Sequence, residues 1–419
     1  MLSLRERFFR LLSFLPLFAF LMMALTLPAF AGEEVITDGI LHVVNGAEPS
    51  GGRQTMNLEE LWRAGGEDDE ETVFGIITKV LIDDDNNIYL LDAQLSEISV
   101  FSPEGELINT LGREGEGPGE FRGPADMCFL PDGTIGVLQT FPGKVIKLNL
   151  DNTSAGTWPL GDPTKGAFYM MRGLRQGGGN VVAGGTEQHV DQANGIITRE
   201  TFLSNLTTEG LRDKTFATTS VTMKLAELRL DEKELIDGAD RRFDVGDDGQ
   251  VVVAIPRNGY EVSIFAADGT LKRVFSREYE PWQRDERAAG IWQRILETVQ
   301  RTQLPGAPIS WEDTEPDVEF IRVARDGTIW ILNSRAMWTE TPGAFTYYDV
   351  FSPMGHFEKQ VQVICEGNPK DDILFFAGND LAFMITGFWD AALSRFGGSG
   401  TEDDEDEAEP MSVICYRIK

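Results

Sequence analysis

The sequence predicts an all-β fold, a six-bladed β-propeller with four-stranded blades, and three observations carry this prediction. One pattern recurs, most clearly near residues 80, 240 and 320: a strand, a tight turn, a strand, a variable gap, a strand, a Gly turn and a strand. Uninterrupted copies lie about 46 to 52 residues apart, which is the length of a propeller blade. The last copy lacks a fourth strand, and an unassigned strand precedes the first copy.

Six copies align on the first apolar residue of the second strand in each blade. These anchors are Ile88, Ile135, Val181, Val251, Ile329 and Leu381. The turn before each anchor contains Asn, Asp or Gly, which tolerate the positive φ of a two-residue hairpin. The two longer intervals, after Val181 and after Val251, contain insertions of about 25–30 residues.

The ends of the chain predict how the ring closes. The segment 412–419 supplies a third strand for blade 6, and no fourth strand follows it. We expect residues 56–64 to pair there, because this would remove two exposed sheet edges. The propeller domain is therefore predicted to span 56–419. Residues 32–55 are polar and Gly-rich and predict a flexible leader.

The first 31 residues have the features of a secretory signal peptide. Arg5, Arg7 and Arg10 precede an apolar run, and Ala29 to Ala31 form a small-x-small cleavage site. We expect cleavage near Ala31 and a periplasmic or extracellular protein. No later stretch is apolar for long enough to cross a membrane as a helix, so we expect a protein that does not span the membrane.

The net charge and the cysteine content limit the kinds of partner and site that we expect for this chain. The formal net charge is −31, and removal of a signal carrying about +2 leaves about −33. Such a charge repels nucleic acid, so we expect no nucleic-acid binding and a monomer with an unknown protein or small-ligand partner. The three cysteines have no zinc-binding spacing. Cys365 and Cys415 fall in strands of neighbouring blades and could pair; the alternative is three free thiols.

All long segments fall on one side of the predicted propeller. We call it the long-loop face: it carries the second-to-third strand loops 186–195, 333–344 and 387–410, and the blade crossings 112–124, 220–238 and 279–316. Function tends to sit on such loops. Apolar residues at helical spacing predict a helical insertion at about 280–304, and 224–236 is a weaker helical candidate. Residues 401–410 form an acidic loop, with a solvated surface or a loose cation site as its two interpretations.

One linker supports a family resemblance. The run 112–124 contains Gly115, Gly117, Pro118-Gly119-Glu120-Phe121 and Pro124, followed by an Asp-Gly hairpin. With the VFSPEG turn of blade 1, it resembles the NHL-repeat family of exported bacterial six-bladed propellers. The resemblance implies the fold; relatives include binding platforms, lactonase-like hydrolases and amidoglycolate lyases, so it implies no single activity. Independently of the resemblance, the aromatic ring of Phe121 can fill the gap between two blades.

Two function classes remain after the motif search. The favoured one is a noncatalytic binding or scaffold propeller that engages a protein or small ligand, since aromatic and arginine side chains are common interface anchors. The alternative is a metal-dependent, lactonase-like hydrolase at the channel mouth, with a divalent cation held by acidic and amide groups. Whether the chain is an enzyme stays open, and the sequence leans against it. A three-histidine zinc site does not fit, because only His42, His189 and His356 are present.

Each of these two function classes has its own candidate residues. The candidate ligand- or partner-binding residues on the long-loop face are Gln139, His189, Arg257, Arg335, Trp338 and Trp389. The conceivable cation ligands are Asp92, Gln139, Asp244 and Asn333. No catalytic residue and no cofactor is assigned.

Overall fold

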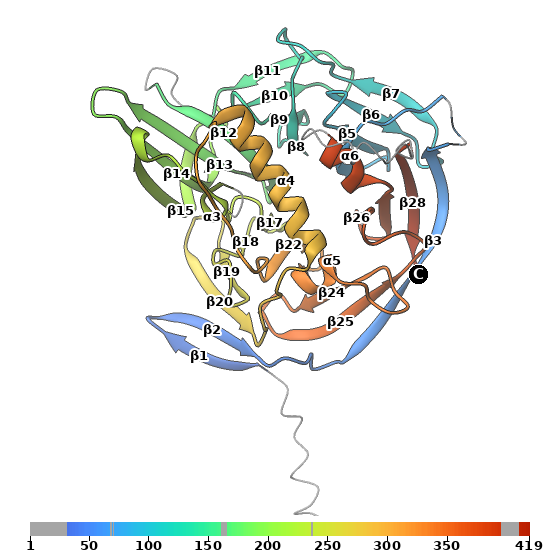
Figure 1. The fold of residues 1–419 in the computed structure, drawn as a ribbon. Coiled ribbons are helices and arrows are strands. Elements are labelled where there is room, and N and C mark those ends of the chain that lie inside the picture. Colours follow the sequence, from blue (N-terminus) through green and yellow to red (C-terminus); the bar gives the residue numbers. More distant parts are fainter. Residues whose placement is uncertain (1–31, 68, 70, 161–165, 236–237, 395–409) are drawn as a thin grey trace, which may run out of the picture.

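The computed structural model describes residues 32–419 except 68, 70, 161–165, 236–237 and 395–409. The predicted signal peptide and residues 401–409 of the acidic loop lie outside the described residues. Six blades of antiparallel strands surround a central axis (Figure 1), which confirms the predicted six-bladed propeller. The first strand of each blade lies innermost (Figure 1), and first strands of neighbouring blades contact each other from blade 6 through blade 1 to blade 5.

The strands of the first three blades run from the axis outward in chain order. Blade 1 contains β4 (Ile77–Ile82), β5 (Ile88–Asp92), β6 (Glu97–Phe101) and β7 (Leu107–Leu111). Blade 2 contains β8 (Pro124–Phe129), β9 (Ile135–Gln139), β10 (Lys144–Leu148) and β11 (Ser154–Trp158). Blade 3 has much longer strands: β12 (Phe168–Gly177), β13 (Asn180–Asp191), β14 (Ile196–Leu206) and β15 (Arg212–Lys224).

The last three blades include strands from the N-terminal segment. Blade 4 contains β17 (Phe243–Val245), β18 (Val251–Val253), β19 (Glu261–Phe265) and β20 (Leu271–Arg277), extended by β2 (Ile40–Asn45) and β1 (Glu33–Thr37). Blade 5 contains β22 (Val318–Val323), β23 (Ile329–Asn333), β24 (Thr346–Phe351) and β25 (Phe357–Ile364). Blade 6 contains β26 (Ile373–Ala377), β27 (Leu381–Ile385), β28 (Ser412–Ile418) and β3 (Arg53–Gly65).

Each anchor residue begins the second strand of its blade, and alternation along that strand builds the core. In β5, Ile88 and Leu90 pack against blade 6, whereas Tyr89 and Leu91 pack against blade 2. A blade lies between two others, so both faces of its sheet are buried and the strand is apolar throughout. Phe121 of the linker is fully buried between blades 1 and 2, as predicted.

The predicted closure of the ring is confirmed. Residues Leu58–Gly65 of β3 pair antiparallel with β28 and form the outer strand of blade 6. Trp62 of β3 stacks on Phe101 of blade 1 and donates its indole N–H to the Pro103 carbonyl at 3.1 Å. Gly105 has φ +88°, and a Cβ there would lie 2.6 Å from the Trp62 ring, so glycine is needed for this contact.

The structure differs from the flexible leader expected for 32–55. Strands β1 and β2 form a hairpin, and β2 pairs in parallel with β20 of blade 4. The first residues of β3 then pair in parallel with β25 of blade 5. Residues 33–65 therefore form a belt around the outer edges of blades 4, 5 and 6. Backbone hydrogen bonds to these edges order the belt, although its composition is polar and Gly-rich.

Asn45 links the belt to two blades. Its amide nitrogen donates to the carbonyls of Ser276 in blade 4 and Gly355 at the end of blade 5, both at 2.9 Å. Its amide oxygen accepts from the Phe357 N–H at 2.9 Å, and the side chain is buried. A single amide thus satisfies backbone groups at the boundary between two blades.

The helices lie on the long-loop face, as expected. The predicted insertion is α4 (Glu286–Gln303), which crosses this face diagonally (Figure 1), with Asp285 as its N-cap. Short helices α5 (Ser334–Trp338) and α6 (Phe388–Ser394) follow the second strands of blades 5 and 6. In place of the weaker candidate helix 224–236 the chain has the 3-10 turn η2 (Leu225–Glu227), β16 (Leu230–Asp231) and α3 (Glu232–Leu235). Strand β16 pairs in parallel with β21 (Ile309–Ser310).

Two further expectations concern cysteines and membranes. Cys128, Cys365 and Cys415 are all free thiols, so the alternative of a Cys365–Cys415 bridge is not realised. Burial raises the pKa of each thiol to about 12, which disfavours the reactive thiolate. Among the described residues, no helix has the length and apolar character to cross a membrane.

Candidate functional site

A small aromatic core fixes the helices of the long-loop face. Trp338 of α5 lies parallel to Trp282, with ring centroids 6.4 Å apart, and contacts Trp389 of α6 at 5.5 Å. The apolar stripe of α4, including Ile291, packs on the same group. The indole of Trp338 donates to Glu319 Oε1 at 3.0 Å. These contacts join the crossing between blades 4 and 5 to the loops that carry α5 in blade 5 and α6 in blade 6, and together they form one layer above the propeller.

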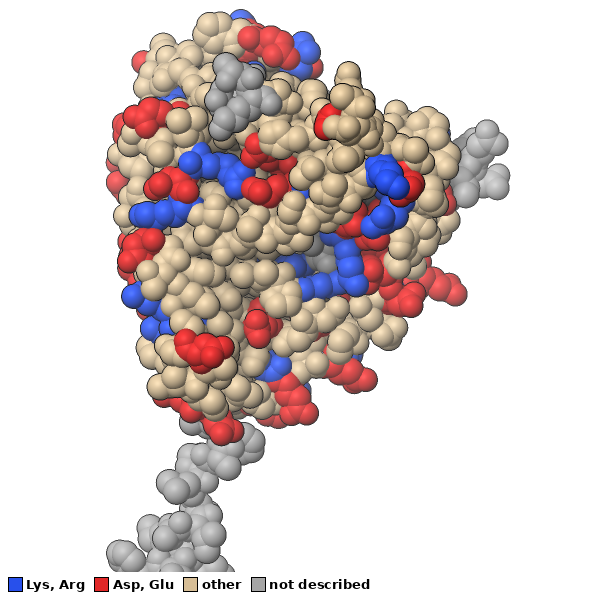
Figure 2. All heavy atoms as spheres, turned by 90° about the vertical axis from the view of Figure 1, so that its left-hand side faces the viewer, with Lys and Arg blue, Asp and Glu red and all other residues tan. Residues whose placement is uncertain are grey.

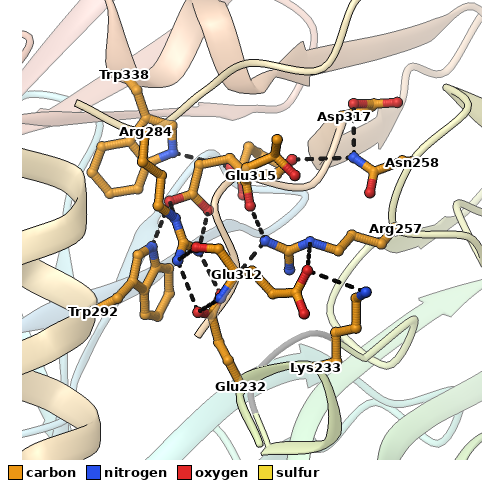
Figure 3. A network of polar contacts seen from close by, with 12 residues as sticks. Glu232, Lys233, Arg257, Asn258, Arg284, Trp292, Glu312, Glu315, Asp317 and Trp338 are labelled. Carbon is orange, nitrogen blue, oxygen red and sulfur yellow. Dashed lines mark hydrogen bonds and ion pairs between the residues drawn. The ribbon is translucent and has the colours of Figure 1, made fainter. Parts of the chain in front are cut away.

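An ion-pair network anchors the start of α4 (Figure 3). Arg284, immediately before the N-cap, donates from Nε to Glu315 Oε1 at 2.6 Å and from Nη1 to Glu232 Oε2 at 2.8 Å. The indole N–H of Trp292 on α4 also donates to Glu315 Oε1, at 2.6 Å. Arg257 lies 3.5 Å from Glu232 and donates to the Thr314 carbonyl. The network therefore ties α4 to α3 and to the chain entering blade 5.

Burial makes this network strong and self-contained. The side chains of Arg284, Glu232 and Glu315 are almost fully buried. Burial alone would lower the pKa of Arg284, but the hydrogen bonds that it donates to Glu232 and Glu315 outweigh burial and raise that pKa. Burial raises the pKa of Glu315 despite its contacts with Arg284. Each carboxylate has donors and each guanidinium has acceptors, so the group is suited to holding α4 in place.

A small hollow lies beside the network. Its volume is about 70 Å³, and Arg241, Arg242, Arg257, Trp292 and Glu319 are among its lining residues. At about 30 Å³ for each water molecule, it holds about two waters. A ligand larger than a few atoms does not fit there.

A larger hollow lies between the long hairpin of blade 3 and the segment that contains α3. We call it the blade 3 pocket. It has a volume of about 180 Å³ and is lined by Arg199, Thr201, Phe202, Leu203, Ala217, Thr218, Thr219, Val221, Lys233, Glu234, Gly238, Ala239, Asp240 and Ile255. Figure 2 views the molecule from the side of blade 3 and shows Lys and Arg side chains around a hollow, with Asp and Glu close by.

The charged groups of the blade 3 pocket are incompletely paired. In the described part of the chain, Asp240 is fully buried and neither carboxylate oxygen has a hydrogen-bond donor; Arg172 Nη1 lies 3.7 Å away. Glu234 accepts from Arg229 through Oε1 at 2.7 Å, whereas its buried Oε2 has no partner among these residues. Arg199 has one long hydrogen bond, to Gln188 at 3.5 Å. Burial lowers the pKa of Arg199, although nearby Glu234 opposes this.

The structure brings some of the predicted binding residues together. Arg335, Trp338 and Trp389 lie in α5 and α6, and Trp338 contacts Trp389 directly. Trp338 is buried in the aromatic core, so it packs helices rather than presenting a free ring. Arg335 donates to the Glu280 carbonyl at 2.9 Å and keeps 38% of its side chain exposed.

The other three predicted residues lie apart from that group. Arg257 is part of the ion-pair network. Gln139 is fully buried, accepts from the Arg122 N–H and donates to the Pro142 carbonyl, so it holds the loop after β9. His189 lies on the protruding end of β13 and contacts Glu187 Oε1 at 2.8 Å.

The conceivable cation ligands have structural contacts in separate blades. Asp92 of blade 1 accepts four backbone N–H groups, including Gly75 at 2.7 Å. Asn333 of blade 5 caps α5 and donates to Asp349 at 2.7 Å. Among the residues that the structure describes, no three His, Cys, Asp or Glu side chains are grouped as a metal-binding set.

Asp244 belongs to a chain of ion pairs along the inner strands of blades 1 to 4. Lys79 of blade 1 lies 3.3 Å from Asp126 of blade 2, Asp126 also pairs with Arg175 of blade 3, and Arg175 lies 3.8 Å from Asp244 of blade 4. Asp244 in turn accepts the Val323 N–H of blade 5 at 2.7 Å. Charge alternates from blade 1 to blade 4, so this chain of ion pairs links inner strands that share no backbone hydrogen bonds.

Sequence reasoning missed Arg284, Glu232 and Glu315, and it missed Arg199, Glu234 and Asp240. None of them belongs to a motif, and they lie in segments 30 or more residues apart that only the fold brings together. One signal was available for the first group: Arg284 lies near the start of the predicted helical insertion, where a cation opposes the helix dipole and needs a carboxylate partner.

Comparison with a family model agrees with this architecture. A family model described as a 6-bladed β-propeller, DUF5128, matches residues 67–161. A search of curated proteins finds no significant match. Among solved structures, a candidate exported protein from Bacteroides fragilis is 12% identical with a TM-score of 0.48, covering 90% of this chain and 100% of that chain.

Two other solved structures are similar at comparable levels. A member of the DUF4221 family from Bacteroides vulgatus is 12% identical with a TM-score of 0.46, covering 88% of this chain and 99% of its own. Virginiamycin B lyase from Staphylococcus aureus is 7% identical with a TM-score of 0.41, covering 84% and 98%.

Proposed function

We propose that this chain is an exported, noncatalytic binding propeller that takes a small ligand or a protein on its long-loop face. The observation that carries the proposal is the blade 3 pocket, which has a volume of about 180 Å³. It lies beside α3, and buried ion pairs tie α3 to the start of α4. A preorganised site needs rigid support, and the network and the aromatic core supply it. We also propose that the chain is related to the NHL-repeat propellers, because its linker 112–124 resembles theirs.

A binding screen tests this function. Mature protein is melted with a panel of small polar compounds and incubated with candidate partner proteins, and the same is done for Arg199→Gln. We expect at least one compound or partner to raise the Tm or be captured, and the variant to weaken that effect. Arg301→Gln, an exposed change on α4, is the matched control. Binding that is insensitive to every change on the long-loop face would contradict the proposal.

The metal-dependent hydrolase is the competing function, and metal analysis of the purified protein distinguishes the two. We expect no stoichiometric, tightly held divalent ion, and no turnover of lactone or ester substrates. A bound ion at one equivalent, whose removal abolishes turnover, would replace the binding proposal by the hydrolase.

Export is the remaining part of the proposal, and it rests on residues 1–31. N-terminal sequencing of protein recovered from the periplasm or medium should start at Gly32. An intact Met1, or recovery in the cytoplasm only, would contradict it.

A further inference from the structure

We infer that the blade 3 pocket is a binding site for a free α-amino acid with a short aliphatic side chain. This inference deepens the proposed function and rests on it. It follows from three properties of the pocket taken together: a cation with no carboxylate at ion-pair distance among the described residues, buried carboxylate oxygens without donors, and apolar side chains on the rest of the wall.

The carboxylates call for a donor from the ligand. Asp240 is fully buried, and its two oxygens have no hydrogen-bond donor among the described residues, with Arg172 at 3.7 Å as its ion-pair partner. Glu234 Oε2 is likewise buried without a donor in this part of the structure. A buried acceptor left without a donor costs about 1–3 kcal/mol. These oxygens are closed off from the pocket in this structure, so an ammonium group, which offers three donors, would satisfy them once the two side chains rotate toward the ligand.

The cation calls for an acceptor. Arg199 is half-buried on β14, and among the described residues its hydrogen bond is a long one, 3.5 Å, to the neutral amide of Gln188. The other cation on the pocket wall, Lys233, is already paired with Glu312 at 3.1 Å. A guanidinium binds a carboxylate in a two-pronged geometry, so Arg199 is the group that a ligand carboxylate would contact.

Size and lining limit the rest of the ligand. Phe202, Leu203, Val221 and Ile255 contribute apolar surface to the wall. A volume of about 180 Å³ equals about six waters, and a cavity of about 150 Å³ accommodates benzene, so the ligand has roughly six to nine non-hydrogen atoms. Alanine and valine fall in this range. Each carries the two opposite charges on one carbon, beside an aliphatic group.

Four probes test the charge requirement by calorimetric titration of the mature protein. L-valine is compared with isovalerate, which lacks the ammonium, with isobutylamine, which lacks the carboxylate, and with isobutanol, which lacks both. We expect heat of binding with L-valine, and binding at least about thirty-fold weaker with each of the other three, because each leaves a charged group unpaired. Equal affinity for valine and isobutanol would overturn the inference.

Two variants assign the charges to residues. Arg199→Gln should remove the preference for valine over isobutylamine, and Asp240→Asn should remove the preference for valine over isovalerate. If Asp240→Asn lowers the Tm, Glu234→Gln tests the ammonium contact instead, because Glu234 is less buried than Asp240. Arg301→Gln should leave valine affinity unchanged. Retained discrimination in both pocket variants would contradict the assignment.

The outcomes separate this inference from the proposed function. If L-valine and L-alanine do not bind, but another compound or partner binds and Arg199→Gln weakens it, the ligand class is wrong and the binding function stands. If nothing binds to the long-loop face in either experiment, the binding function itself fails.

Discussion

Asp126 shows how one buried side chain holds neighbouring blades together. It pairs with Lys79 of blade 1 and Arg175 of blade 3 and accepts the Leu174 N–H at 2.9 Å. Burial alone would raise the pKa of Asp126, but the charges of Arg175 and Lys79 outweigh it and lower that pKa. Burial lowers the pKa of Lys79. Removing one member therefore leaves buried charges of the other sign uncompensated.

We predict that Asp126→Asn lowers the free energy of unfolding by about 3 kcal/mol or more at pH 7. Because the folded-state pKa of Asp126 is lowered, its contribution is present above the ordinary pKa and is lost as the pH falls through the folded value. The gap between wild type and variant should therefore shrink below about pH 4. Urea unfolding at pH 7, 4 and 3 measures this, with Asp38→Asn, an exposed site, as control. A gap that stays constant with pH would contradict the prediction.

Asn45 gives a second prediction at the scale of one residue. Asn45→Ala removes three hydrogen bonds between the belt and blades 4 and 5 and leaves buried backbone groups unsatisfied. We expect a loss of about 2 kcal/mol or more in the free energy of unfolding. Asn109→Ala, at an exposed position with a bond only to its neighbour, should cost less than about 0.5 kcal/mol. Equal effects of the two changes would refute the role of Asn45.

Single residues were the hardest part of the site to predict from the sequence. Trp338 and Arg257 were chosen for their side-chain type, and both lie on the long-loop face, yet their contacts are with the protein itself. Residue type identifies groups that could bind a ligand. Which of them keeps polar atoms without a hydrogen-bond partner depends on neighbours that are distant in the sequence, as the buried oxygens of Asp240 illustrate within the described part of the chain.

At the scale of elements, α4 is an added layer rather than part of a blade. Its apolar stripe was visible in the sequence at helical spacing, so the helix itself was predictable. Its docking position was not, because Trp282, α5 and α6 supply the surface that it covers. The helix is thus held by side chains from the crossing between blades 4 and 5 and from loops within blades 5 and 6.

This arrangement predicts the effect of Trp338→Ala. Removing a buried indole costs about 3–5 kcal/mol, and the loss should be local to the layer that it supports. Hydrogen–deuterium exchange should increase in α4 and α6, with blades 1 and 2 unchanged. Trp311→Ala, at a site 42% exposed, is the matched control and should change neither region. Uniform deprotection of all blades after Trp338→Ala would show that α4 is not a separable layer.

At the scale of the whole molecule, the belt determines whether the ring closes. Strand β3 is the outer strand of blade 6 and also the outermost strand of blade 5. Deleting residues 32–66 leaves both edges unpaired, and we expect the Tm to fall by at least about 10 °C, since 1 kcal/mol corresponds to about 2–4 °C in a large domain. Deleting 32–50 removes only β1 and β2 and should cost less. Equal melting curves for wild type and the longer deletion would rule out closure by β3.

The strand pattern of this propeller is local information, so the sequence alone determined it. The period-2 alternation, the Asn, Asp and Gly turns and the six anchors depend on neighbours a few residues apart. Ring closure was also predictable, because a missing strand at one end matched a spare strand at the other. Composition misled us about 32–55: a polar segment becomes a belt only where a finished blade offers it an edge.

The tertiary structure alone decided the charge pairing on the long-loop face. Arg284 is separated from Glu232 by 52 residues and from Glu315 by 31, and these three side chains pair fully. Arg199 and Asp240 line one pocket without pairing with each other. This contrast with the fully paired network is the basis for the proposed ligand site. The strength of an electrostatic interaction depends on the distance between the charged groups and on how deeply they are buried. In a chain that folds back on itself, the spacing of residues along the sequence determines neither of these quantities.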